Sequence, residues 1–162
     1  MVRTADPTFG GVPQAKWTFR LKRLLGIDYG TKRIGLALGD TDARIAVPLT
    51  VVSAQGGVRR QVDSIIETAA EYGADEYVLG IPYNMDDTVG KQAKITQSFG
   101  KMLEEVSGCV VHECDERLSS LAADEYLQQA ELTKKKKKAR RDALAAQVIL
   151  QTYFDTPVTE ES

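Results

Sequence analysis

The sequence predicts an α/β protein with a five-stranded mixed sheet flanked by helices. Between Leu24 and Asp40, two apolar runs flank a short turn that contains a glycine, which is typical of a hairpin of buried strands. Further along the chain, short apolar runs alternate with segments of helical periodicity, the pattern of strands joined by crossover helices. The 162 residues, 43% hydrophobic and 27% charged, suffice for one globular domain with a sizeable core.

The first three strands are expected to be linked by hairpins. They cover about residues 24–28 and 33–38 and a third run around Leu49. Pro48 has no backbone N–H to donate, so it favours an edge strand or a late strand start there.

The fourth and fifth strands are expected to run parallel to the first, because each is reached through a crossover helix. Gly73 follows the first helical pattern as a helix stop. The elements expected after the three hairpin-linked strands are, in chain order, a helix from about 57 to 72, a strand over 76–82, a helix from about 88, a strand over about 109–113, a helix after the segment DERLSS and a helix over about 140–154.

The two ends of the chain differ from its centre. Residues 1–22 contain Pro7 and Pro13 and show no clear period, so a loosely ordered N-terminal extension is expected. The domain itself is expected over residues 23–155, and residues 156–162 form an acidic tail expected to fray. No apolar run is long enough to span a bilayer and no secretory core stands at the N-terminus. A cytoplasmic protein without a membrane partner is therefore expected.

Four acidic residues stand where a packed sheet and helix would bring them together. Asp28 ends the first strand, and Asp115 and Glu116 follow the fifth, at the same edge if those strands are parallel. Asp142 is expected to open the last helix, on a face of small and apolar residues. Two alternatives stay open: Asp28 caps its own turn, and Asp142 is only a favourable charge in a helix's first turn.

Converging carboxylates without sulfur or imidazole ligands favour hard cations such as Mg²⁺ or Mn²⁺. Two such ions can activate a water and stabilise the leaving oxygen of a phosphodiester. The chain has a single histidine, so a zinc site of the usual type is not expected. Cys109 and Cys114 lie too far apart along one expected strand, and on opposite faces of it, to form a disulfide.

The positive charges are concentrated in one segment. The net charge is −2, yet seven of the 21 Lys and Arg residues fall between 134 and 141. Such a run suits a polyanionic substrate, although a solvated loop is an equally good interpretation. The residues predicted to bind nucleic acid are Lys32, Lys134, Lys135, Lys136, Lys137, Lys138, Arg140 and Arg141.

Four segments in this order resemble those of the YqgF/RuvX family: GIDYGTKRIGLAL, VLGIPYNMDDT, DERLSS and KKKARRDALAAQVILQTYFD. The resemblance covers about Leu24 to Asp155 and implies an RNase H-like fold. It also implies a nuclease, a hydrolase acting on ester bonds. The family is described both as a Holliday junction resolvase and as the nuclease that matures the 5′ end of pre-16S rRNA.

The resemblance assigns residues as well as a fold. The aspartate of the family's DxG motif falls on Asp28, its DERLS acidic pair on Asp115 and Glu116, and its helix aspartate on Asp142. Of the acidic pair, Glu116 is favoured as the metal ligand and Asp115 is an additional candidate. Asp87 stands where the family has glycine in an NMDGT loop. The implied partners are pre-rRNA, within the precursor of the small ribosomal subunit, or branched DNA, bound by a monomer or a homodimer.

Two other classes of protein compete with a nuclease. Asp28 to Thr31 resembles the phosphate-binding hairpin of ATP-binding proteins of the actin and sugar-kinase type, but those need two such domains and this chain has one. A non-catalytic RNA- or protein-binding module on the same fold is the other alternative. The sequence favours processing of pre-16S rRNA, with junction resolution as the alternative activity.

Overall fold

The computed structural model describes residues 21–118 and 134–157, which form a single five-stranded sheet and the helices that flank it. The elements are β1 (Arg23–Tyr29), β2 (Arg33–Asp40), β3 (Val47–Ser53), α1 (Val58–Tyr72), β4 (Glu76–Ile81), α2 (Lys91–Ser107), β5 (Val111–Asp115), the short 3₁₀ helix η2 (Glu116–Leu118) and α4 (Lys134–Asp155).

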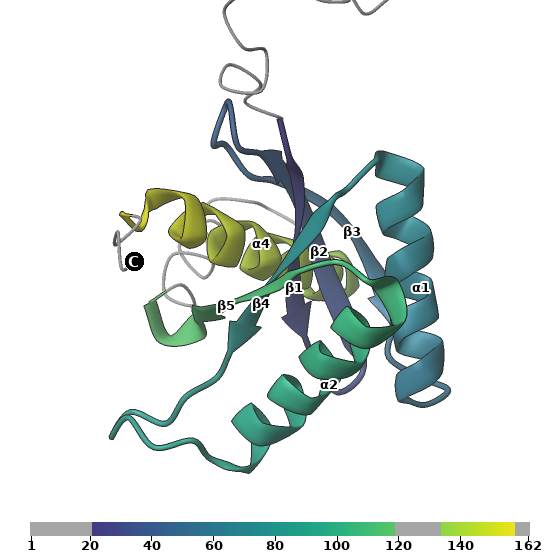
Figure 1. Cartoon of the computed structure of the whole chain (residues 1–162). Helices are drawn as coiled ribbons and strands as arrows, with labels where there is room; N and C mark the ends of the chain where they lie inside the picture. Colours follow the sequence, from purple (N-terminus) through teal and green to yellow (C-terminus); the bar gives the residue numbers. More distant parts are fainter. Residues whose placement is uncertain (1–20, 119–133, 158–162) are drawn as a thin grey trace, which may run out of the picture.

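The predicted mixed sheet is confirmed. Its strand order is β3-β2-β1-β4-β5, with β1, β2 and β3 antiparallel and β4 and β5 added parallel to β1. Helices α1 and α2 cover one face and α4 lies across the other (Figure 1). The edge position of β3 agrees with the presence of Pro48 in that strand.

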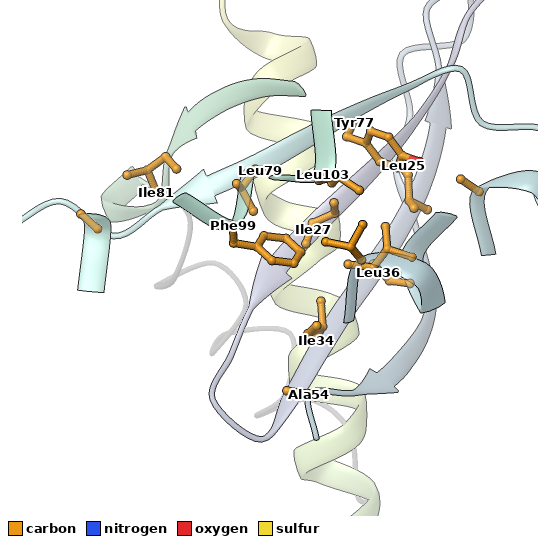
Figure 2. Packing of buried hydrophobic residues seen from close by; sticks show 14 residues of the cluster. Leu25, Ile27, Ile34, Leu36, Ala54, Tyr77, Leu79, Ile81, Phe99 and Leu103 are labelled. Atoms are coloured by element: carbon orange, nitrogen blue, oxygen red, sulfur yellow. The ribbon is translucent and has the colours of Figure 1, made fainter. Parts of the chain in front are cut away.

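Alternation along the strands divides the core into two layers. In β1, Leu25 and Ile27 point to the α1/α2 face, where they pack with Leu79 of β4 and Phe99 of α2 (Figure 2). Leu24 belongs instead to the cluster under α4. Successive residues of a strand face opposite sides, so Gly26 and Asp28 share the α4 face with Leu24.

Glycines on that face let α4 approach the sheet closely. A Cβ at Gly26 would stand 2.8 Å from Leu150 Cβ, and one at Gly80 would stand 2.5 Å from Ile149 Cδ1. At Gly35 in β2, a Cβ would overlap the carbonyl oxygen of Asp142. The helix backbone at Asp142 is therefore held directly against β2.

The last helix begins earlier than predicted. It starts at Lys134 rather than near residue 140, so the lysine run forms its first turns and is not a linker loop. Lysine has a good helix propensity, which outweighs repulsion along the run. Asp142 consequently lies about two turns inside α4 and does not open it, so the first-turn interpretation is wrong.

Two other boundaries differ from the prediction. The fifth strand spans 111–115 rather than 109–113, because pairing with β4 begins where Tyr77 faces Val111. The second helix begins at Lys91, since Thr88 is used in the preceding turn, where its hydroxyl donates to Asp86 over 2.6 Å.

Several expectations concern parts of the chain outside the described residues. The N-terminal extension up to residue 20, the helix expected after DERLSS and most of the acidic tail lie there. Cys109 and Cys114 are both free thiols, as predicted. Among the described residues, no helix is both long and apolar enough to cross a membrane.

Replacing Gly35 by alanine is expected to destabilise the protein by about 2 kcal/mol or more, because the new methyl group displaces α4 from β2. Gly100→Ala is the matched control. That glycine lies inside α2, and a Cβ there would meet the ends of two side chains, Leu79 Cδ2 at 2.8 Å and Val111 Cγ1 at 3.7 Å, so a change within about 1 kcal/mol is expected. Urea unfolding measures both. Equal effects would contradict the close contact at Gly35.

Candidate functional site

Asp28 is a half-buried carboxylate at the carboxyl end of β1, on the face that α4 covers. Burial raises the pKa of Asp28 to about 7, and the charges of Glu116 and Asp142 add to the rise. Loss of hydration disfavours the ionised carboxylate, and nearby negative charges disfavour it further. The charges of Glu116 and Asp142 therefore both act on Asp28.

Glu116 and Asp115 have different surroundings, although they are neighbours in sequence. Cys114 packs in the cluster under α4, so alternation turns Asp115 away from that cluster. Glu116 opens η2, and burial raises its pKa, with a further contribution from the charge of Asp115. Of the two acids, Glu116 is the one whose charge bears on Asp28.

Asp115 is engaged by Arg117. The Arg117 guanidinium donates hydrogen bonds to both carboxylate oxygens of Asp115, from Nε to Oδ1 over 3.0 Å and from Nη2 to Oδ2 over 2.6 Å. These hydrogen bonds hold the pKa of Asp115 below its usual range. Because one guanidinium holds both of its oxygens, Asp115 is a poor candidate for binding a metal ion as well.

Arg117 also ties the loop between β4 and α2 to the start of η2. Its Nη1 donates to the backbone carbonyl of Asn84 and to Asp87 Oδ1, each over 2.8 Å. Asp87, the residue that replaces the family's glycine, has a φ of 68°, in the left-handed region that glycine adopts freely. The loop thus keeps the glycine-like backbone while the Asp87 carboxylate adds an ion pair to Arg117.

Asp142 has a partner that the sequence did not single out. Arg33 Nε donates to Asp142 Oδ2 over 2.6 Å, and the two side chains are 38% and 24% exposed. The sequence favoured the neighbouring Lys32. Alternation along β2 was the signal that could have identified Arg33, because Arg33 shares the α4 face with Gly35 and Ala37.

The predicted nucleic-acid-binding residues occupy two places. Lys32 is exposed in the turn between β1 and β2. The residues Lys134 to Lys138, Arg140 and Arg141 all belong to the first turns of α4, directly before Asp142. Arg141 is exposed. The backbone therefore places the positive run at the end of α4 nearest Asp142.

The donor set suits a hard divalent cation. Asp28, Glu116 and Asp142 offer only carboxylate oxygens. A cation would offset both the burial of the charged Asp28 and the smaller repulsion from Glu116 and Asp142, which together raise the pKa of Asp28. Within residues 21–118 and 134–157, however, no three acidic, histidine or cysteine side chains are gathered tightly enough to hold an ion as they stand. Arg33 supplies the positive charge beside Asp142 instead.

The sheet topology defines the class of protein. Three antiparallel strands continued by two parallel ones, with helices on both faces, make an RNase H-like α/β fold. The structure titled "T. thermophilus RuvC in complex with Holliday junction substrate" has the same fold, with a TM-score of 0.54 over 82% of this chain and 93% of that chain. Its sequence is 16% identical, so the likeness concerns the fold alone.

The sequence comparisons identify the family. The family model RuvX, described as Holliday junction resolvase, matches residues 22–156. A Chloroflexus aurantiacus protein named "Putative pre-16S rRNA nuclease" is 40% identical over 132 residues, 82% of this chain and 86% of its own length. A Bacillus pumilus protein of the same name is 38% identical over 135 residues, 83% of this chain and 98% of its own length. The chain belongs to the RuvX family.

The raised pKa of Asp28 predicts a pH-dependent stability for the metal-free protein. Between about pH 4 and pH 7 the folded protein keeps a proton on Asp28 that the unfolded chain, with an ordinary value of 3.8, has released. Stability should therefore fall as the pH rises through this window. Asp28→Asn removes this contribution. In EDTA, the melting temperature of the variant relative to that of the parent should therefore be higher at pH 7.5 than at pH 4.5.

Asp115→Asn is the control for this measurement. Because Arg117 lowers the pKa of Asp115, that carboxylate stabilises the fold at neutral pH, and its loss should lower the melting temperature there. A difference between Asp28→Asn and the parent that is the same at both pH values would contradict the raised pKa.

Proposed function

We propose that this protein is a divalent-metal-dependent nuclease that hydrolyses phosphodiester bonds at the 5′ end of pre-16S rRNA during ribosome biogenesis. The observation that carries the proposal is the half-buried Asp28 at the end of β1, whose pKa is raised by burial and, in addition, by the charges of Glu116 and Asp142. The substrate is taken from the relatives that bear the name of a pre-16S rRNA nuclease. We place the activity in the cytoplasm.

Asp28, Glu116 and Asp142 are the proposed ligands of Mg²⁺ or Mn²⁺. When bound, such ions supply an activated water and stabilise the leaving oxygen. The half-buried position of Asp28 limits access of bulk water, which strengthens the electrostatic effect of each charge. Asp115 has a positioning role in this proposal: with Arg117 it anchors the turn from which Glu116 projects.

Lys32 and the basic run of α4 are the proposed contacts to the phosphate backbone. Lysine and arginine side chains beside phosphates release bound counterions and fix the position of the strand without reading its sequence. The end of α4 that carries the run leads directly to Asp142, so a strand bound there passes close to the carboxylates. Trimming the end of an RNA requires one active site, which a monomer provides.

Resolution of branched DNA is the second candidate, because the matching family model is described as Holliday junction resolvase. A resolvase cuts two strands, so this activity predicts a homodimer with two sites. Both activities use the same carboxylates. They differ in substrate and in assembly.

A cleavage assay with Mg²⁺ and with Mn²⁺ tests the proposal on two substrates, a 16S rRNA precursor with its 5′ extension and a four-way DNA junction. Asp142→Asn keeps the side-chain shape and removes one ligand charge, so cleavage should fall by about 100-fold or more. Magnesium should also raise the melting temperature of the variant less than that of the parent, because stabilisation follows occupancy of the native site.

Asp63→Asn is the matched control, since Asp63 is exposed on α1 and pairs with Arg59 one turn away. It should cleave at the parental rate. Parental activity in Asp142→Asn would refute the assigned ligand, and cleavage of the junction alone, by a dimer, would favour the second candidate.

Replacing Lys134, Lys136 and Lys138 with glutamine should weaken binding to a single-stranded RNA of any sequence. Each lost phosphate contact reduces the slope of log affinity against log salt by about 0.7, so a reduction of about 2 is expected. Fluorescence anisotropy across a salt series measures it.

A control with the same charge change carries glutamine at Lys91, Lys94 and Lys101, exposed positions of α2 on the other face of the sheet. Its salt slope should stay near the parental value. Equal slopes in both triple variants would show that the basic run of α4 makes no particular contact.

A further inference from the structure

The pair formed by Arg33 and Asp142 lies inside the carboxylate site. Asp28 faces Gly35 across β1 and β2, and the backbone of Asp142 lies against the same glycine. Asp142 Oδ2 accepts from Arg33 Nε over 2.6 Å. The partner of Arg33 in this ion pair is a proposed metal ligand. The guanidinium therefore uses a carboxylate oxygen that the proposed function assigns to a metal ion.

The two partners differ in how freely they can move. The backbone of Asp142 is fixed by the sheet, because its carbonyl oxygen lies directly against Gly35 of β2, which has no side chain. Arg33 is the more exposed partner, at 38% against 24%, and has a long flexible side chain at the start of β2. If the pair breaks, the side chain that leaves is that of Arg33.

A guanidinium and a divalent cation do not share one half-buried carboxylate well. Arg33 already uses an oxygen of Asp142 and carries a positive charge that would repel a bound ion at close range. Without Arg33 or a metal ion, however, Asp142 would stand near Asp28 with no positive charge from either, and two like charges at short range repel each other.

We propose that Arg33 is the internal counterion of this site: it pairs with Asp142 while no divalent ion is bound and gives up that carboxylate when the ion binds. The proposal rests on the metal site of the proposed function and adds a coupling to it. Arg33 keeps the metal-free site folded and, by competing for Asp142, weakens the affinity for the metal.

Titration with Mn²⁺, following the free ion by electron paramagnetic resonance, tests the competition without any cleavage. Arg33→Gln should bind Mn²⁺ about tenfold more tightly than the parent, the size expected for loss of one competing charged hydrogen bond. In EDTA, the same variant should melt at a lower temperature than the parent, because Asp142 is then unpaired.

Lys32→Gln is the matched control, since it removes the same charge from the adjacent exposed position. Its Mn²⁺ affinity should change less than threefold. In a background of Asp142→Asn, replacing Arg33 should no longer tighten binding, because the contested carboxylate is gone. That result separates a specific pair from a general change of charge.

Unchanged or weaker Mn²⁺ binding by Arg33→Gln would overturn the proposal and would make Arg33 a support that orients Asp142 as a ligand. An equal gain in Lys32→Gln would overturn it too. Failure of the proposed function looks different: the parent itself would then bind no Mn²⁺ and cleave neither substrate, which removes the inference as well.

Discussion

The structure depends on the close contact between α4 and one face of the sheet. Gly26, Gly35 and Gly80 leave that face without side chains where the helix crosses, so the helix lies nearer the strands than larger residues would allow. Packing of Ile149 and Leu150 into this space anchors the helix. Asp142 lies in the same crossing of helix and sheet. The contact that completes the core therefore also places the Asp142 carboxylate near the carboxyl end of β1.

The same contact has an electrostatic cost. It brings Asp142 towards Asp28, and the raised pKa of Asp28 reflects burial first and then the charges of Glu116 and Asp142. Ion pairs with arginines limit this cost: Arg117 pairs with Asp115 and Arg33 pairs with Asp142. The carboxylate oxygens of the site are what would attract a divalent cation.

Much of the fold could be predicted because its signals are local. The glycine turn after Asp28 and the stop at Gly73, which adopts the left-handed conformation, depend on neighbouring residues only. The start of β5 could not be found in this way, since it is set by pairing of Val111 with Tyr77 of β4. The start of α4 was missed because a run of lysines is compatible with a solvated loop and with a helix.

For the site, the sequence by itself determined which acids are available. It also indicated that Asp28 and the acidic pair after the fifth strand stand at the same edge of the sheet, since β1 and β5 both run parallel to β4 between them. Only the tertiary structure decided that Glu116 rather than Asp115 acts on Asp28, and that Arg33 rather than Lys32 reaches Asp142. Arg33 and Asp142 are 109 residues apart in the chain. Their contact depends on where α4 crosses β2, and that crossing is set by packing over the whole face of the sheet, which no local pattern encodes.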